Sequence, residues 1–328
     1  MKAVYINEFG GPENLEIRDV PDPLKPSGDS VLVRVKAAAL NRADLLQRRG
    51  VYPAPAGFSQ NIPGLEFAGE VVETGENVTG LNPGDRVFGI TAGEAQAELL
   101  SIHESLLAPI PGSLSFTEAA AVPEAFITAY DAIFTLGALK GPETLLIHAV
   151  GSGVGLAALQ LAKAAAVTVI GTSRTADKLD KCRELGLDYS ILADANADIA
   201  KSGKEVTGGK GVDVILDLVG AGYFQANLDS LALKGRLILV GLTSGSTAEF
   251  NLGIALQKRL KIIGTVLRGR SIEEKAEAVS RFSQDVLPLI ISGNVKANVD
   301  RIFSFKDVAD AHRYLESNES FGKVILEF

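Results

Sequence analysis

A glycine-rich segment in the middle of the chain has the residue types and spacing for binding phosphate. It follows a short apolar run, Leu145–His148, and leads into an apolar helical segment, Leu156–Lys163. Small residues let the chain turn sharply there and bring backbone N–H groups and the positive end of a helix to a pyrophosphate. The alternative is a tight strand-to-helix turn without a ligand, because the glycines alternate and do not fit G-x-G-x-x-G. The residues expected to contact a dinucleotide are Gly151, Ser152, Gly153, Val154 and Gly155.

The residues after the next apolar run distinguish two forms of such a cofactor. An NAD enzyme places Asp or Glu about 20 residues past the glycine loop, where it accepts hydrogen bonds from the ribose 2′-hydroxyl. This chain has Thr172-Ser173-Arg174, followed by Lys178. Ser173 can donate a hydrogen bond to a 2′-phosphate, and Arg174 and Lys178 can donate charge-assisted ones. We therefore expect NADPH, and the alternative is that both cations are solvated residues at a helix start.

The composition argues against several other kinds of site. Cys182 is the single cysteine of 328 residues, so neither an intrachain disulfide nor a thiolate zinc site can form. His103, His148 and His312 lack the spacing of metal ligands, so we expect no metal. A formal net charge of −8 disfavours nucleic acid or an anionic membrane as the partner. We see no secretory signal and no apolar stretch of the ~18 residues that a membrane span needs, so we expect a cytoplasmic protein without membrane contact.

The pattern of apolar residues changes along the chain and indicates which elements position these groups. Residues 1–120 are typical of short antiparallel strands, with Val31, Val33 and Val35 alternating against polar neighbours. Helical patterns then alternate with buried apolar runs, as in βαβ units. We predict an α/β protein in which a doubly wound parallel-sheet domain, residues 121–266, is inserted into a mostly β domain formed by residues 1–120 and 267–328.

Individual elements follow from the same pattern. The strands expected in the inserted domain are Leu145–His148, Val167–Thr172, Val212–Asp217, Arg236–Gly241 and Leu260–Val266. In the returning segment we expect a helix over Ile272–Ile291, a short helix over Val308–Glu316 and a strand over Lys323–Phe328.

Several motifs, weak when taken singly, resemble one family when taken together. They cover essentially the whole chain: Asn41–Arg48, Pro63–Gly69, Gly84–Val87, Ala121–Ala125, the glycine segment with Gln160 and Lys163, and Phe321–Val324. In this combination the chain resembles the zinc-free quinone oxidoreductase, or zeta-crystallin-like, branch of the medium-chain dehydrogenase/reductase superfamily. Asn41–Gln47 and Gly264–Arg268 look closest to its inducible NADPH-quinone oxidoreductases. The resemblance implies a GroES-like β-barrel for the first domain and a six-stranded Rossmann sheet for the second.

The same resemblance implies that a metal site has been lost. Zinc enzymes of the superfamily bind the metal through a Cys and a Gly-His-Glu motif. The matching positions here are Asn41 and Gly64-Leu65-Glu66, so two of the ligands are missing.

The resemblance also implies roles for individual residues. Family members line the nicotinamide site with residues that match Asn41, Tyr52 and Thr128, and we expect Asn41 and Tyr52 to act on the substrate as hydrogen-bond donors. The alternatives are a turn residue at Asn41 and an exposed loop tyrosine at Tyr52. A tyrosine that often faces the adenosine ribose is Ala193 here. The further cofactor positions that the resemblance implies are Gly241, Leu242, Thr243, Leu267, Arg268 and Lys323.

The sequence leaves three functions open. Reduction of a quinone or a similarly conjugated carbonyl is favoured. Reduction of the activated double bond of an enone or enoyl thioester is the second, because Arg42, Arg48 and Arg49 could form a basic rim for a phosphorylated carrier. A non-catalytic NADPH-binding role is the third. The resemblance suggests a homodimer.

Overall fold

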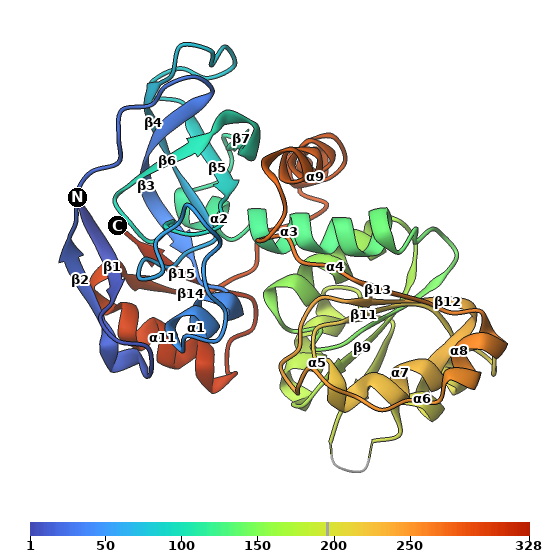
Figure 1. The fold of residues 1–328 in the computed structure, drawn as a ribbon. Coiled ribbons are helices and arrows are strands. Elements are labelled where there is room, and N and C mark those ends of the chain that lie inside the picture. Colours follow the sequence, from blue (N-terminus) through green and yellow to red (C-terminus); the bar gives the residue numbers. More distant parts are fainter. Residues whose placement is uncertain (195–196) are drawn as a thin grey trace. The chain divides into compact units, whose positions relative to one another are not determined.

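The computed structural model describes residues 1–194 and 197–328, which form two compact units (Figure 1). Unit 1 consists of Met1–Ile127 and Leu267–Phe328, and unit 2 of Thr128–Val266. The first crossing between the units lies inside helix α3 (Pro123–Tyr130) and not near residue 120. The difference arises because α2 (Phe116–Ala120), the first helix after the strands, packs on strands of the large sheet of unit 1.

Unit 1 is built on a seven-stranded, mostly antiparallel sheet. Its strand order is β14-β15-β3-β4-β5-β7, with β6 paired to β3. Val31, Val33 and Val35 alternate along β3 and are buried, as the sequence predicts, in a core with Phe67 and Leu100. A separate two-stranded ribbon is formed by β1 (Lys2–Ile6) and β2 (Leu15–Asp19). The strands of the large sheet are β3 (Ser30–Ala39), β4 (Glu66–Thr74), β5 (Arg86–Ile90), β6 (Leu99–His103), β7 (Leu107–Pro109), β14 (Val299–Ser304) and β15 (Lys323–Glu327).

The returning segment completes this sheet. β15 pairs antiparallel with β3 and parallel with β14, so residues from the two parts of unit 1 lie side by side. The single helix expected over Ile272–Ile291 is two helices, α9 (Ile272–Asp285) and α10 (Leu287–Ile291). Pro288 explains the break, because a proline has no N–H to donate to the preceding turn. The other helices of unit 1 are α1 (Arg42–Arg48) and α11 (Val308–Ser317).

Unit 2 contains a six-stranded parallel sheet. All five predicted strands are present, four of them with shifted ends, and the short edge strand β10 is additional. The strands are β8 (Thr144–Ile147), β9 (Thr168–Ser173), β10 (Tyr189–Leu192), β11 (Val212–Asp217), β12 (Leu231–Leu239) and β13 (Lys261–Gly264). The helices are α4 (Gly153–Ala164), α5 (Ala176–Glu184), α6 (Ile199–Val206), α7 (Phe224–Ser230) and α8 (Leu252–Lys258), with a π-helix η3 over Asp131–Leu136.

The strand order of unit 2 defines where a ligand can bind. The order β10-β9-β8-β11-β12-β13 reverses direction between β8 and β11. This is the order of a doubly wound dinucleotide-binding sheet, whose ligands lie beyond the carboxyl ends of the strands at the reversal. The predicted fold class is confirmed.

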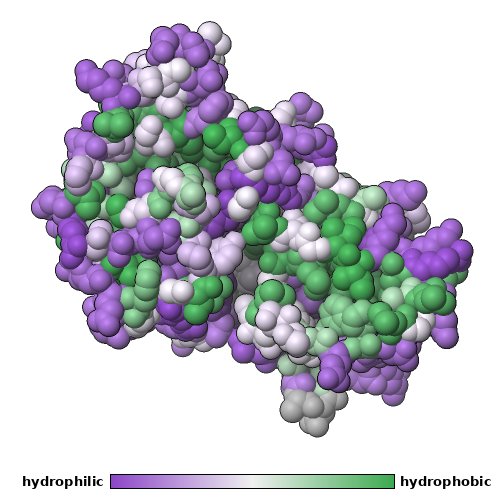
Figure 2. Space-filling view, viewed as in Figure 1, coloured by the Kyte–Doolittle hydropathy of each residue, from purple (hydrophilic) through white to green (hydrophobic). Residues whose placement is uncertain are grey.

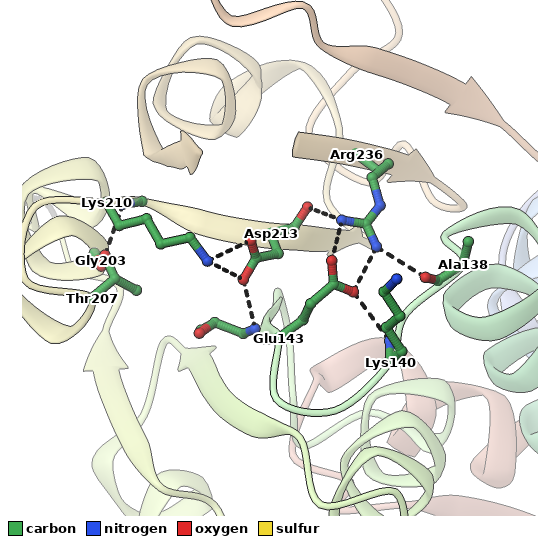
Figure 3. Close-up of polar contacts among 10 residues, drawn as sticks. Ala138, Lys140, Glu143, Gly203, Thr207, Lys210, Asp213 and Arg236 are labelled. Carbon is green, nitrogen blue, oxygen red and sulfur yellow. Dashed lines mark hydrogen bonds and ion pairs between the residues drawn. The ribbon is translucent and has the colours of Figure 1, made fainter. Parts of the chain in front are cut away.

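The opposite, amino-terminal edge of this sheet is held by ion pairs (Figure 3). The Arg236 Nη1 and Nη2 atoms donate to the two carboxylate oxygens of Glu143 at 2.9 and 2.8 Å. Asp213 accepts from the backbone N–H of Thr144 at 2.9 Å and from the Lys210 ammonium at 2.9 Å. These contacts join the beginnings of β8, β11 and the parallel part of β12, so we assign them to the stability of the sheet.

One apolar helical run contradicts the expectation that no apolar stretch is long enough to span a membrane. Phe116–Leu136, which comprises α2, α3 and η3, has 21 residues and passes that test by length and composition. Most of the run is buried inside the protein, and mostly buried core helices pass the same test. We therefore interpret it as a core helix.

Candidate functional site

The glycine segment of unit 2 forms the turn between β8 and α4. The Ser152 hydroxyl accepts a hydrogen bond from the Gly155 N–H at 3.1 Å and caps the first turn of α4. A Cβ atom at Gly155 would lie 2.6 Å from the carbonyl oxygens of both Ala149 and Val150, so only glycine allows this close packing of helix on strand. The arrangement presents a helix N-terminus at the carboxyl edge of the sheet, where backbone N–H groups favour an anion.

A buried hydrogen-bonded network lies directly beneath this turn. The His148 ring contacts the Thr172 hydroxyl at 3.0 Å through Nδ1 and the Asn227 Oδ1 at 2.6 Å through Nε2. The Asn227 amide donates to Asp217 at 2.9 Å, so its oxygen must accept from His148 Nε2–H and Nδ1 must accept from Thr172. Burial lowers the pKa of His148, which is consistent with a neutral ring.

The same network fixes the loop that follows β11. The second Asp217 oxygen accepts from the N–H groups of Val219 at 2.7 Å and Gly220 at 2.9 Å. His148, Thr172 and Asp217 come from the ends of β8, β9 and β11. The network therefore joins three strands at the edge where a ligand is expected.

The end of β9 presents the residues expected to read a 2′-phosphate. Ser173 is the last residue of β9, Arg174 follows it with an exposed side chain, and Lys178 lies in the first turn of α5. Tyr223 lies near them, with its ring 4.8 Å from the His148 ring. Burial raises the pKa of the Tyr223 hydroxyl and the Arg174 charge opposes this shift, so the two side chains share one electrostatic environment.

Four further predicted cofactor residues lie in unit 2, three in one loop and one in α3. The loop Gly241–Thr243 follows β12 and packs against Leu218, whose carbonyl would be 2.6 Å from a Cβ at Gly241. Leu242 in this loop is exposed. The Thr128 hydroxyl is buried and has no hydrogen-bond partner among the residues that the structure describes. A buried hydroxyl without a partner is costly, so Thr128 has a hydrogen bond available for a bound group.

The predicted substrate residue Asn41 lies in a buried charged cluster of unit 1. Its amide nitrogen donates to the Glu66 carboxylate at 2.9 Å, and its oxygen accepts from the Lys323 ammonium at 2.7 Å. Lys323 also pairs with Glu66 at 2.6 Å and donates to the Leu40 carbonyl at 2.9 Å. The side chains of Lys323 and Glu66 are 5% and 0% exposed. Both ends of the Asn41 amide are thus fixed by charge.

Asp44 supports this cluster from α1. Its carboxylate accepts from the backbone N–H of Asn41 at 2.7 Å and of Gly64 at 2.9 Å. Gly64 has a φ of 112° and its Cβ would lie 2.5 Å from the backbone nitrogen of Gln96, so this position requires glycine. Burial raises the pKa of Asp44 to about 6, against the opposing effect of those two N–H donors.

Tyr52 and Arg268 form the other predicted group in unit 1. The Arg268 guanidinium lies 5.1 Å from the centre of the Tyr52 ring and donates to the carbonyls of Ala92 at 2.7 Å and Tyr52 at 3.2 Å. It also donates to the Gln47 side chain. The half-buried Tyr52 hydroxyl has no hydrogen-bond partner among the described residues. Burial raises its pKa and the Arg268 charge opposes this shift, so Tyr52 is a neutral hydrogen-bond donor at neutral pH.

Comparisons with known proteins establish the family. Residues 27–131 match the family model of the alcohol dehydrogenase GroES-like domain, and residues 153–284 match that of the zinc-binding dehydrogenases. The quinone oxidoreductase of Pseudomonas aeruginosa is 34% identical to this chain over 330 residues, which cover 99% of each protein. The chain belongs to the quinone oxidoreductase branch of the medium-chain dehydrogenase/reductase superfamily.

Solved structures of this superfamily match essentially the whole length of this chain. The crystal structure of Escherichia coli quinone oxidoreductase complexed with NADPH superposes with a TM-score of 0.90, at 32% identity and with 100% of both chains covered. The enoyl reductase JamJ has a TM-score of 0.88 at 25% identity, with 99% of this chain and 98% of that chain covered.

One of the matching family models is named for zinc binding, but the residues of this chain do not fit a zinc ion. Asn41 offers an amide whose atoms are bonded to Glu66 and Lys323, and Leu65 has no donor atom. The Lys323 ammonium already supplies the positive charge beside Glu66. No group of three or more His, Cys, Asp or Glu side chains in residues 1–194 and 197–328 is arranged to hold a metal ion.

Several residues of the site were not predicted, and some predicted contacts have other partners. Glu66, Asp44 and Gln47 belong to the cluster in unit 1, and Tyr223, Asn227 and Asp217 to that in unit 2. The charged groups of Arg268 and Lys323 donate hydrogen bonds to other residues of unit 1, and Leu267 is buried. A cofactor contact at these three positions therefore requires the backbone or a rearrangement of these bonds.

Proposed function

We propose that the chain reduces quinones, with a hydride taken from the nicotinamide of NADPH and without a metal. The observation that carries this proposal is the Lys323 ammonium bonded to Glu66 and Asn41, which leaves hydrogen-bond donors but no place for a Lewis acid. A simple ketone needs a Lewis acid or a strong donor to stabilise the developing alkoxide. A reduced quinone spreads its charge over a conjugated system and needs less stabilisation.

The residues of unit 2 fit the proposed cofactor. The turn at Gly151–Gly155 offers a helix N-terminus to the pyrophosphate, and Arg174 offers a cation to the 2′-phosphate. The unpartnered Thr128 hydroxyl can donate to the nicotinamide end. The E. coli relative, which was solved in complex with NADPH, supports the same choice. The bound cofactor supplies the hydride, and these residues bind and orient it.

The residues of unit 1 supply donors for the acceptor. The Tyr52 hydroxyl has a free proton, and the second N–H of Asn41 makes only a long 3.4 Å contact with the Ala39 carbonyl. Fixed donors of this kind stabilise the negative charge that develops on the quinone oxygen. We propose that both residues act on the acceptor in this way.

The state of three arginines in unit 1 supports a quinone over an enoyl thioester on a phosphorylated carrier. Of the three arginines considered for a basic rim, Arg48 is fully buried and donates to Glu316 at 3.0 Å. Arg49 pairs with the same carboxylate, and Arg42 donates to Asn318. The likeness to JamJ nevertheless keeps enone and enoyl thioester reduction as the second candidate.

Steady-state kinetics with NADPH and a panel of acceptors test the proposal. We expect quinones to give the highest kcat/KM, followed by enones and enoyl thioesters, and a simple ketone to react very slowly. Tyr52→Phe should lower kcat/KM for the best quinone about tenfold while the Kd of NADPH stays unchanged, because the hydroxyl acts mainly in the transition state. Tyr189→Phe, an exposed tyrosine of β10, is the matched control. A ketone reduced as fast as the best quinone contradicts the proposal. Tight NADPH binding with weak turnover of every acceptor favours the non-catalytic role.

We also propose that the protein is a homodimer formed through β13. This strand is at the end of the sheet and pairs only with β12 among the described residues. A hydrophobic surface extends over β13 and α8 in unit 2 (Figure 2). Leu252 and Leu256, one turn apart on α8, are 72% and 79% exposed, and Ile262, Val266 and Leu233 of unit 2 are also exposed. A second copy of the same chain could pair with the free edge and cover this surface.

A further inference from the structure

Glu124 differs from Glu66 and Asp44, the two carboxylates of the Asn41 cluster, because its side chain has no hydrogen-bond partner among the described residues. It is the second residue of α3, and its backbone N–H donates to the Glu66 Oε2 atom at 2.8 Å. The other Glu66 oxygen is bonded to Lys323 at 2.6 Å and to Asn41 at 2.9 Å. Glu66 is thus satisfied at both oxygens, whereas the half-buried Glu124 carboxyl is bonded to no other described residue.

The titratable groups that face Glu124 come from four elements and two loops. Glu66 on β4 and Asp44 on α1 are acidic, and Lys323 on β15 and Lys275 on α9 are basic. Arg268 and Tyr52 lie in the loops. Lys323 is paired directly with Glu66, and Lys275 is buried without a hydrogen bond to Glu124. Burial and the neighbouring Glu66 carboxylate raise the pKa of Glu124 to about 8, against the opposing effect of the two lysines. At neutral pH its carboxyl therefore carries a proton.

Quinone reduction needs such a group. Addition of a hydride to a neutral quinone gives a hydroquinone anion, and a proton must then reach its oxygen. Tyr52 is a poor source, because burial raises its pKa above that of a free phenol. A carboxylic acid that is neutral near the working pH is the better acid, since general acids work best with a pKa close to that pH.

We propose that Glu124 is the proton donor of the reduction, an assignment that rests on the proposed function. The hydride from the reduced nicotinamide brings two electrons to the quinone and leaves oxidised cofactor. The Glu124 O–H bond then breaks and a new O–H bond forms on the hydroquinone oxygen. Solvent returns the proton to the Glu124 carboxylate after the product leaves. Tyr52 and Asn41 remain hydrogen-bond donors, and Glu66 positions Asn41 and the backbone of Glu124.

The test compares wild type with Glu124→Gln and Glu124→Asp. The amide of Glu124→Gln keeps the shape of the side chain but cannot release a proton at neutral pH. Glu73→Gln is the matched control, because Glu73 is an exposed residue on the same strand as Glu66. Each protein is assayed for kcat with a saturating quinone from pH 6 to about 9.5, in H₂O and D₂O, and for its Kd for NADPH.

We expect kcat of wild type and Glu73→Gln to fall as the pH rises through about 8, because the acid must carry its proton. Glu124→Gln should lower kcat about a hundredfold, remove this decline and reduce the solvent isotope effect, with the Kd for NADPH unchanged. Glu124→Asp should restore part of the rate and the pH dependence. A purely structural role would not produce this change in the pH profile.

Infrared spectra of the protein without cofactor give an independent readout. At pH 7 wild type should show the C=O stretch of a neutral carboxylic acid, and Glu124→Gln should lack it. Absence of the band in wild type overturns the proposal, as does a Glu124→Gln variant with wild-type kcat and pH profile. A wild type that reduces no quinone instead overturns the proposed function on which it rests.

Discussion

The side chains of Asn41 and Arg174 differ in how they are held before a ligand binds. Asn41 is held between Glu66 and Lys323, so its amide is oriented before any substrate arrives. Arg174 is exposed and follows the last residue of β9, so its charge remains available to a solvent-borne anion. The first arrangement suits transition-state stabilisation, and the second suits recognition of a phosphate.

Arg174→Ala should weaken NADPH binding about ten- to a hundredfold and leave NADH binding nearly unchanged, because only NADPH carries the 2′-phosphate. The measurement is the Kd of each cofactor by fluorescence titration. Arg183→Ala, an exposed arginine of α5 that pairs with Asp180, is the control and should change neither value. Equal losses for NADPH and NADH would contradict the role of Arg174.

At the residue scale, what could be predicted depended on the motifs. Asn41 and Tyr52 were predicted through a family resemblance, and the structure gives both of them polar or charged neighbours that the sequence did not indicate. Lys323 lies 282 positions from Asn41, and no periodic pattern links residues so far apart. Glu124 could not be recognised either, since its unusual protonation depends on charges from several elements.

At the scale of elements, the carboxyl edge of the parallel sheet depends on one side-chain network. Asn227 of α7 connects His148 to Asp217, and Asp217 holds the loop after β11. None of these three side chains is exposed. The network therefore couples the position of a helix to the shape of the edge where the cofactor is proposed to bind.

Asn227→Ala should reduce the free energy of unfolding by about 3 kcal/mol, because it leaves His148 and a buried Asp217 oxygen without their partner. It should also weaken NADPH binding, since the loop after β11 loses its support. Urea denaturation and cofactor titration measure the two effects. Gln225→Ala, on the exposed side of the same helix, should leave both unchanged. A stability equal to wild type would show that the network is not required.

The elements themselves were largely predictable, because buried parallel strands are short apolar runs. Val212–Asp217 is entirely buried, and its predicted ends match β11. β10 was missed because its residues are mostly exposed or partly exposed, as on an edge strand. The break between α9 and α10 followed from Pro288, which the apolar pattern of Ile272–Ile291 obscured.

At the scale of the whole molecule, buried acids make stability depend on pH. The pKa of Glu124 is about 8 in the folded protein and near 4.5 when the chain is unfolded. Between these values the folded state binds more protons, so stability must fall as the pH rises. His312 has the opposite effect at lower pH, because burial holds its pKa at about 3 against an ordinary value of 6.5.

We therefore expect the urea midpoint of wild type to fall between pH 6.5 and 8.5, above the range in which His312 contributes. Glu124→Gln should show a smaller decline, because the amide does not ionise. Glu73→Gln should behave as wild type. Identical pH dependences for Glu124→Gln and wild type would contradict the raised pKa of Glu124.

Leu256→Glu should convert the proposed dimer into a monomer, because it places a charge in the hydrophobic surface beside β13. Sedimentation equilibrium measures the mass of each species. Leu24→Glu is the control, since Leu24 is an exposed leucine of unit 1 at 88% exposure. A monomeric wild type, or a Leu256→Glu variant that stays dimeric, would contradict this interface.

The insertion of unit 2 into unit 1 has a consequence for biosynthesis. The ribosome makes Asn41 and Glu66 before all of Thr128–Val266, and it makes Lys323 only after that unit. Until then the nascent chain holds a carboxylate that belongs in the core without the cation that neutralises it. β3 likewise has no β15 to pair with along one edge. Unit 2 can complete its sheet during translation, because domains fold as units while the chain emerges. The site in unit 1 is thus assembled last, and ribosome stalling within unit 2 would expose an unfinished sheet to chaperones and proteases.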